Sequence, residues 1–371
     1  MARIATFDDW VDLFHEWQKD IGYDAKLLGD YQFEAKFGDL KTQEVEFGDY
    51  AGRRKWEGLR EIPDQRIQDA LLHLITYQGD TEFASVEQQR NLVDTAPTDY
   101  DLQSLAKVNR EEMRHGFQMC YLLVNHFGTP GKIEAQKMME RRAYKKNRLL
   151  GAFNGDVNNW LDFFAYTQFV DRDGKYQLTM LSHSGFAPLA RSMMAMLKEE
   201  YYHLLTGHTG LLRIVKAGKI PVEIVQKYMN KWIPMSVDLF GTDHSSTAHW
   251  AYVWGLKGRY DEAQGKEAAD KERLNEAARA LYVHEISGLV AALNKEIPAD
   301  RPKLFIPDPK FRRGIGEYAG KPYSVLGDLL STEAYERHLH EVLPGPEDEA
   351  RLSAVFKERD WILPVERGSA S

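Results

Sequence analysis

Two Glu-x-x-His motifs, at residues 112–115 and 200–203, constrain this chain of 371 residues more than any other feature. Positions i and i+3 of an α-helix lie on one face, so in each motif the carboxylate and the imidazole point the same way. Both side chains of one motif can therefore reach the same metal ion. Two such helices, each partnered by a helix with one further carboxylate, provide the ligand set of a four-helix bundle that holds two metal ions.

The residues around both motifs place them in a helical core. Apolar residues recur at steps of three and four, and the motif residues fill the gaps in each stripe. Buried carboxylates and imidazoles are costly unless they are paired, hydrogen-bonded or bound to metal, so this placement favours a metal site. The alternative is a metal-free core in which the histidines bond to carboxylates. The stripes consist of Leu105, Val108, Met119 and Leu122 around the first motif, and of Leu189, Met193, Met196 and Leu211 around the second.

A site for two metal ions needs one more carboxylate on the helix that precedes each motif helix. Glu82 lies 30 residues before the glutamate of the first motif, and Asp171 lies 29 residues before that of the second. This near-equal spacing suits two antiparallel helix pairs that meet at one level. On spacing and apolar pattern alone, Glu87 remains a rival of Glu82, and Asp173 remains a rival of Asp171.

Four carboxylates and two imidazoles make a set of ligands rich in oxygen. Such a set suits iron or manganese, whereas zinc rarely takes six ligands. A facial triad of two histidines and one carboxylate around a single iron is the neighbouring option. Glu111 and Glu199 directly precede the two motif glutamates. We hypothesise that each accepts the imidazole N–H of the other motif's histidine and so orients that ligand, with helix-surface charge as the alternative.

The composition narrows the class of protein. The net charge of −8 gives no electrostatic case for binding nucleic acid or an anionic membrane. The sequence contains no run of about eighteen apolar residues and begins without an apolar signal region, so we expect a cytoplasmic protein. The single cysteine, Cys120, excludes an intrachain disulfide and a cysteine-rich zinc or iron–sulfur site. The oligomeric state stays open.

The hydrophobic periodicity predicts an all-α protein, a four-helix bundle with peripheral helices and little β structure. Residues 128–131, Gly-Thr-Pro-Gly, predict a helix end, and breaks are expected near Gly79 and Gly174. We divide the chain into an N-terminal helix and irregular segment (1–63), the bundle (64–260) and a C-terminal extension (261–371), within one domain overall. Helices are expected over residues 7–20, 64–82 and beyond, 98–127, 132–146, 158–171 and beyond, 188–216, 221–239 and 267–293, with residues 30–56 irregular or β-like.

Several stretches between about residue 65 and residue 260 resemble the oxygenase components of benzoyl-coenzyme A 2,3-epoxidases, a family of ferritin-like non-haem di-iron enzymes. The similarity goes well beyond the Glu-x-x-His motifs, but it weakens after Gly258. The stretches that carry it are residues 78–82, 84–90, 169–175, 188–191 and 255–259.

The resemblance implies a monooxygenase that uses O2 and two electrons to convert an aromatic acyl-CoA, foremost benzoyl-CoA, to its ring epoxide. Electrons would come from NADPH through a separate reductase with flavin and iron–sulfur centres. Gln78 matches a family residue close to the metals and the substrate ring, and is the candidate catalytic residue. The family's ligands to two non-haem iron ions correspond here to Glu82, Glu112, His115, Asp171, Glu200 and His203, which favours Asp171 over Asp173.

The weaker similarity after Gly258 leaves the acyl group open, with phenylacetyl-CoA and substituted aromatic acyl-CoAs as alternatives. The other interpretations of the bundle are an N-oxygenase, a desaturase, the radical-generating component of a reductase, and a non-oxygenase di-iron protein that stores or detoxifies iron. Lys257 and Arg259 are candidates for the cations that bind the CoA phosphates, and solvated basic residues are the alternative.

Overall fold

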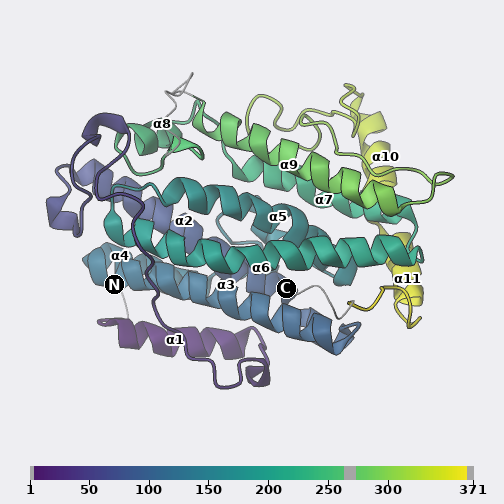
Figure 1. The fold of residues 1–371 in the computed structure, drawn as a ribbon, viewed down its shortest axis with the longest axis horizontal. Coiled ribbons are helices and arrows are strands. Elements are labelled where there is room, and N and C mark those ends of the chain that lie inside the picture. Colours follow the sequence, from purple (N-terminus) through teal and green to yellow (C-terminus); the bar gives the residue numbers. More distant parts are fainter. Residues whose placement is uncertain (1–3, 263–272, 366–371) are drawn as a thin grey trace.

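Four long helices form the centre of the molecule (Figure 1). The computed structural model describes residues 4–262 and 273–365. The long helices pack most closely as two pairs, α2 with α3 and α5 with α6, and α3 also packs against α6. Their bounds are Gln65–Gln89 (α2), Asp99–His126 (α3), Trp160–Leu181 (α5) and Ala187–Ala217 (α6).

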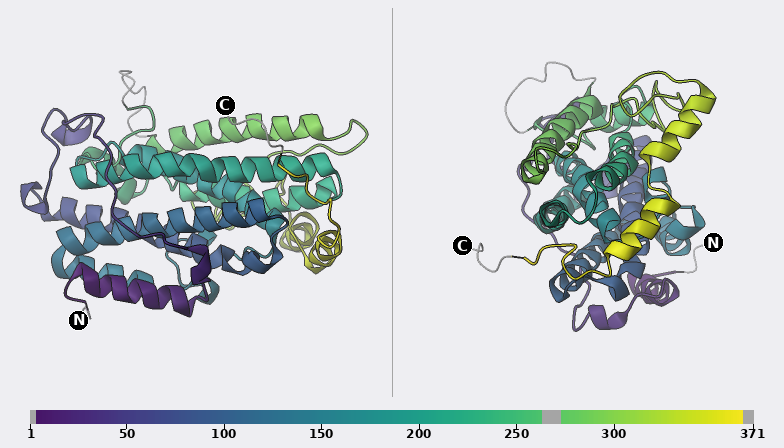
Figure 2. Two further views of the ribbon diagram at one scale, coloured as in Figure 1. Left: turned by 60° about the horizontal axis from the view of Figure 1, so that its bottom comes forward. Right: turned by 90° about the vertical axis from the view of Figure 1, so that its right-hand side faces the viewer.

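Shorter helices cover the bundle on several sides. Helix α1 packs against α3 and α4, while α7 and α9 pack over α5, and α9 also contacts α6. Figure 2 shows α10 and α11 crossing one end of the bundle. No helix in the described part of the chain is long and apolar enough to cross a lipid bilayer. The bounds are Phe7–Asp20 (α1), Gly128–Glu140 (α4), Val222–Leu239 (α7), Ser246–Val253 (α8), Leu274–Glu296 (α9), Thr332–Val342 (α10) and Pro346–Val355 (α11).

Buried apolar side chains form two clusters that flank the centre of the bundle. One cluster gathers around α5, α7 and α9 and includes Trp160, Trp232 and Tyr282. The other gathers around α1, α3 and α4 and includes Trp10 and Phe117. Large apolar surface is thus removed from water on both sides of the four long helices, and this burial is the main stabilising contribution to the fold.

Side chains at the helix starts explain where three bundle helices begin. Thr98 accepts a hydrogen bond from the Asp101 backbone N–H and caps α3, and Asn159 does the same for α5 through the Asp162 N–H. Asp64 caps α2 through the Arg66 N–H. These caps satisfy backbone donors that have no partner inside the helix. Helix α6 ends at Gly218, whose φ of +66° is a left-handed conformation that glycine adopts without strain.

Two glycines let α5 and α6 approach each other closely. A Cβ atom at Gly207 would lie 2.4 Å from the backbone nitrogen of Gln168, and one at Gly210 would lie 2.1 Å from Cδ1 of Phe164. Neither position has room for a larger side chain. The spacing of these two helices therefore depends on glycine at residues 207 and 210.

The predicted all-α bundle is confirmed, with differences in detail. The expected breaks at Gly79 and Gly174 are wrong, because α2 and α5 run through them without interruption. Gly79 instead allows a close approach of α3, since a Cβ there would lie 2.9 Å from the Cβ of Met119. Residues 30–56 contain no strand, and within the described residues only isolated β-bridges occur, such as Glu44 with Arg54.

Several helix limits also differ from those expected. The Gly-Thr-Pro-Gly segment ends α3, as predicted, but it also begins α4, which stops at Glu140 rather than continuing to residue 146. Helix α9 is described from Leu274, so residues 267–272 of the expected helix lie outside the described part. Helices α8, α10 and α11 were not predicted. The division at residues 63/64 and 260/261 stays a prediction.

Candidate metal centre

The structure brings the six predicted ligand residues together at the middle of the bundle. Helix α2 contributes Glu82, α3 contributes the first motif, α5 contributes Asp171, and α6 contributes the second motif. Each of the six side chains is buried, with at most 8% of its residue surface exposed. Because every one of the four long helices supplies a member, the fold of the bundle itself assembles the cluster.

The distances place both imidazoles against the same group of carboxylates. Nδ1 of His115 lies 3.4 Å from Oε2 of Glu82 and 3.5 Å from Oε1 of Glu200. Nδ1 of His203 lies 3.5 Å from Oε1 of Glu112 and 3.5 Å from Oε2 of Glu200. Glu200 thus lies between the two imidazoles.

Two overlapping sets of three residues have the geometry of a metal site. In each set the potential ligand atoms lie within 4.8 Å of one another, and Glu112 belongs to both. One set adds Glu82 and His115, and the other adds Asp171 and His203. A carboxylate shared between two such sets is suited to bridging two cations.

Buried atoms without hydrogen-bond partners support a cation at this position. Within the described residues, Nδ1 of His115, Nδ1 of His203, Oδ2 of Asp171 and Oε2 of Glu200 have none. Unpaired buried polar atoms are costly. Burial and the neighbouring charge of Glu82 raise the pKa of the Glu112 carboxyl well above its usual range, and burial does the same for Asp171. Divalent cations would offset both the burial and the repulsion among the carboxylates.

The outer nitrogen of each histidine donates to a carboxylate on the opposite motif helix. Nε2 of His115 lies 2.9 Å from Oε2 of Glu199, and Nε2 of His203 lies 3.1 Å from Oε2 of Glu111. This is the crossed arrangement hypothesised for these two glutamates from the sequence. It leaves Nδ1 of each ring facing the carboxylate cluster.

The two outer carboxylates differ in their own partners. Glu199 accepts a hydrogen bond of 2.7 Å from Nε of Arg114, whose side chain is fully buried, and lies 3.6 Å from Nζ of Lys36. Burial opposes ionisation of Glu199, but the bonds from His115 and Arg114 outweigh it and lower its pKa to about 2. Besides His203, the one cation in ion-pair contact with Glu111 in the described part of the chain is the half-exposed Lys107, at 3.9 Å.

The two rival carboxylates lie outside the cluster and have other partners. Glu87 is fully buried, but it pairs with Arg148 and accepts a hydrogen bond of 2.8 Å from the Trp17 indole, so it links α2 to α1 and to the segment after α4. Asp173 accepts a hydrogen bond of 3.0 Å from the Gln177 amide. Cys120 is buried away from the centre and packs against Met138.

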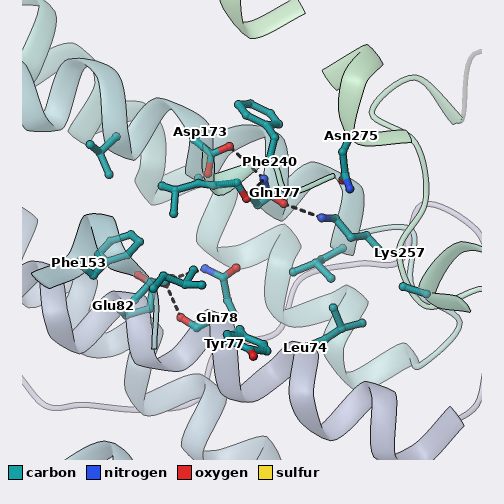
Figure 3. A pocket seen from close by; sticks show the side chains of 18 of the residues that line it. Leu74, Tyr77, Gln78, Glu82, Phe153, Asp173, Gln177, Phe240, Lys257 and Asn275 are labelled. Atoms are coloured by element: carbon teal, nitrogen blue, oxygen red, sulfur yellow. Dashed lines mark hydrogen bonds between the residues drawn. The ribbon is translucent and has the colours of Figure 1, made fainter. Parts of the chain in front are cut away.

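A cavity of about 290 Å³ opens onto the carboxylate cluster (Figure 3). Gln78 lines it and donates a hydrogen bond of 2.5 Å from Nε2 to Oε1 of Glu82. Figure 3 shows a second polar group across the cavity from Gln78, made by Asp173, Gln177 and Lys257. The wall between the two polar groups is mostly apolar and includes Leu150, Phe153, Val170, Leu181, Leu239 and Phe240.

Sequence reasoning did not find two of the polar residues that line this cavity. Gln177 lies four residues after Asp173 on α5, a separation of about one turn that puts both on the same face, and this spacing was the available signal. Asn275 lies at the start of α9, and nothing in the sequence pattern connects it with the bundle. Lys257, a candidate for binding phosphate, lines the cavity and is partly buried.

The bundle and its buried centre define the class: this is a ferritin-like helical protein with a carboxylate–imidazole cluster. The family described as "Phenylacetic acid catabolic protein" matches residues 59–305, more than half of the chain. The chain belongs to this family.

Curated proteins extend the comparison beyond the bundle. The chain is 33% identical to benzoyl-CoA oxygenase component B of Aromatoleum evansii, over 98% of this chain and 92% of that one. It is 22% identical to one of the subunits of the 1,2-phenylacetyl-CoA epoxidase of Escherichia coli (strain K12), over 53% of this chain and 62% of that one. The resemblance noted in the sequence is confirmed, and it extends past residue 260 to nearly the whole chain.

Proposed function

We propose that this chain is the oxygenase component of a monooxygenase that epoxidises the ring of an aromatic acyl-CoA, with benzoyl-CoA to 2,3-epoxybenzoyl-CoA as the leading reaction. The observation that carries the proposal is the cavity that ends on the carboxylate–imidazole cluster. The similarity to a benzoyl-CoA oxygenase component over nearly the whole chain supports the choice of substrate.

Two non-haem iron ions are the proposed cofactor. The residues that would hold them are Glu82, Glu112, His115, Asp171, Glu200 and His203, and the unpaired buried atoms among them fit cations. Four carboxylates with two imidazoles suit iron better than zinc. When bound, the ferrous ions would supply the electrons and the Lewis acidity needed to activate O2, which no amino-acid side chain provides.

The protein's own residues position the ring and keep water out. The apolar wall of the cavity accommodates an aromatic ring and excludes competing solvent. We assign Gln78 the catalytic role because it lines the cavity and contacts Glu82 directly. Its amide holds one oxygen of that carboxylate in place and lies where a ring would approach the centre.

A second component is proposed to deliver the electrons. The name of the Aromatoleum evansii relative, "component B", implies that it works with at least one other component. We propose that a separate reductase with flavin and iron–sulfur centres passes electrons from NADPH to this chain.

Phenylacetyl-CoA is the second candidate substrate. The family description and the name of the Escherichia coli relative both favour it. That relative covers about half of this chain and is less similar than the benzoyl-CoA oxygenase component, so benzoyl-CoA remains the first choice.

The proposed function is tested by incubating the reduced, iron-loaded protein with isotope-labelled O2 and a panel of acyl-CoAs. We expect one labelled oxygen atom in the product from benzoyl-CoA, or from another aromatic acyl-CoA, as measured by mass spectrometry. An aliphatic acyl-CoA of similar size is the control and should give no product. Iron oxidation that never depends on an aromatic acyl-CoA would instead indicate iron storage or detoxification.

The outer carboxylates provide a separate prediction about metal binding. Replacing either Glu111 or Glu199 by alanine should weaken iron binding by about 10- to 100-fold, because an unsupported imidazole is a poorer and less well oriented ligand. Competition with a chelator measures this. Glu199→Ala should also destabilise the metal-free protein by about 3 kcal/mol, since it leaves the buried Arg114 without its carboxylate.

Glu111→Ala is the matched control for stability. Both variants remove a carboxylate from a buried imidazole, but the other cation that Glu111→Ala leaves behind is the half-exposed Lys107. The free energy of unfolding in urea should therefore fall by less than in Glu199→Ala. Equal losses of stability in the two variants would contradict the role assigned to Arg114. Unchanged iron affinity in both would contradict the proposed role of the outer carboxylates.

A further inference from the structure

The end of the cavity farther from Glu82 carries a short chain of hydrogen bonds. Nζ of Lys257 donates to Oε1 of Gln177 at 2.7 Å, and Nε2 of Gln177 donates to Oδ1 of Asp173 at 3.0 Å. Figure 3 shows Gln177 between the other two side chains, with Asn275 close to Lys257. This group is separate from the carboxylate–imidazole cluster described above.

The ammonium group of Lys257 has unused donors. Among the described residues it makes a single hydrogen bond, to a neutral amide oxygen, and no carboxylate lies within ion-pair distance. Burial lowers the pKa of Lys257 to about 8, so the group still carries its charge at neutral pH. An ammonium has three N–H donors, and a partly buried cation with open donors favours a ligand that offers an acceptor oxygen.

Asn275 adds an amide group at the same end of the cavity. The residue is 4% exposed and lines the cavity. Its carbonyl oxygen is closed off from the cavity, whereas Figure 3 shows its amide nitrogen on the side of Lys257. A ligand that fills this end therefore meets N–H donors from both residues and must offer acceptor oxygens.

An acyl thioester of pantetheine offers two such oxygens. The thioester carbonyl of its acyl group is one acceptor, and the carbonyl of the first pantetheine amide is a second acceptor a few bonds further along. The cavity of about 290 Å³ suits the acyl group and the start of the pantetheine arm, and is too small for the nucleotide of CoA as well.

We propose that Lys257 donates a hydrogen bond to the thioester carbonyl oxygen of the bound aromatic acyl-CoA, while the Asn275 amide donates one to the carbonyl oxygen of the adjoining pantetheine amide. The inference rests on the proposed function, because it assumes that an aromatic acyl-CoA occupies this cavity. Holding the carbonyl at this end directs the ring along the apolar wall toward Gln78 and the carboxylate cluster. Lys257 is then a residue that determines specificity for a thioester, rather than one that binds CoA phosphates.

The test compares two ligands that differ only in the carbonyl group. Benzoyl-CoA contains it, and benzyl-CoA, the corresponding thioether, does not. Calorimetry on the iron-loaded wild type should show that benzoyl-CoA binds about 10- to 100-fold more tightly, as expected for a hydrogen bond from a charged donor. Lys257→Met should bring the two affinities within about threefold of each other, mainly by weakening benzoyl-CoA.

Lys295→Met is the control, because Lys295 is exposed on α9 and should leave the preference unchanged. A Lys257→Met protein that keeps the full preference would overturn the inference, and so would a wild type that binds both ligands equally. In those two cases the proposed function stands as long as benzoyl-CoA is epoxidised. Failure of the wild type to bind any aromatic acyl-CoA would instead overturn the proposed function together with the inference.

A second measurement does not depend on the folding of a variant. Isotope-edited infrared spectroscopy of benzoyl-CoA bound to the wild type should show the thioester carbonyl stretch at lower frequency than in water, because a charged donor polarises the bond. A frequency equal to that in an apolar solvent would show that the carbonyl has no donor and would overturn the assignment of Lys257.

Discussion

Replacing His203 by alanine is expected to lower the iron content from about two ions per chain to about one or fewer and to reduce oxygenation of the aromatic acyl-CoA at least about 100-fold. His203 is fully buried, its Nδ1 has no hydrogen-bond partner among the described residues, and that atom faces Glu112 and Glu200. Alanine removes this nitrogen ligand. The half of the cluster that contained His203 then keeps only the carboxylates of Glu112, Asp171 and Glu200. Elemental analysis and coupled O2 consumption measure the two effects.

His284→Ala is a suitable control for the loss of a histidine. His284 is exposed on α9 and far in sequence from both motifs, so iron content and turnover should match the wild type. Full iron content and unchanged turnover in His203→Ala would remove His203 from the centre. Full iron content with lost turnover would keep the residue at the site but contradict its role as a ligand.

Replacing Gly207 by alanine should lower the folding stability strongly. The new Cβ would lie 2.4 Å from the backbone nitrogen of Gln168 and 2.8 Å from its Cα, and backbone atoms of a packed helix cannot move aside cheaply. Helices α5 and α6 must therefore separate. We expect the free energy of unfolding to fall by about 3 kcal/mol, which urea denaturation of the metal-free protein measures.

The same substitution should weaken iron binding. Asp171 follows Gln168 by three residues on α5, and His203 precedes Gly207 by four on α6, so separation of these helices pulls the two ligands apart. Gly288→Ala is the matched control. A Cβ at Gly288 meets nothing within 4 Å, and alanine in an exposed helix should raise stability by about 0.5–1 kcal/mol. A Gly207→Ala protein as stable as the wild type would contradict the close packing of α5 and α6.

Much of the bundle could be predicted because its helices are long and their apolar periodicity is strong. The residues of the two Glu-x-x-His motifs lie on the apolar stripes of their helices, which predicts that they are buried. This placement identified four of the six residues in the cluster. Glu82 and Glu87 could not be separated in this way. Both are buried on α2, and Glu87 is satisfied by Arg148, a partner about sixty residues away that no local pattern connects to it.

The far end of the cavity could not be predicted for a related reason. Gln177, Lys257 and Asn275 come from α5, from the segment after α8 and from the start of α9, and they meet only through the tertiary fold. The glycines within the helices led to the wrong prediction that α2 and α5 are interrupted. Local propensity marks Gly79 as a weak point of a helix, whereas close packing against α3 makes it a contact point.

Both motif helices carry the pattern Glu-Glu-x-x-His, and one difference between them lies at the residue just before each histidine. The first helix has Arg114 there, buried beneath Glu199, whereas the second has Tyr202, which bonds to Ser104 and lies under Lys107. The guanidinium draws charge away from the carboxylate that supports His115, and no buried guanidinium among the described residues does the same to the carboxylate that supports His203. The two histidines are therefore supported by carboxylates in unequal electrostatic surroundings, and the two halves of the centre should differ in their affinity for a metal ion.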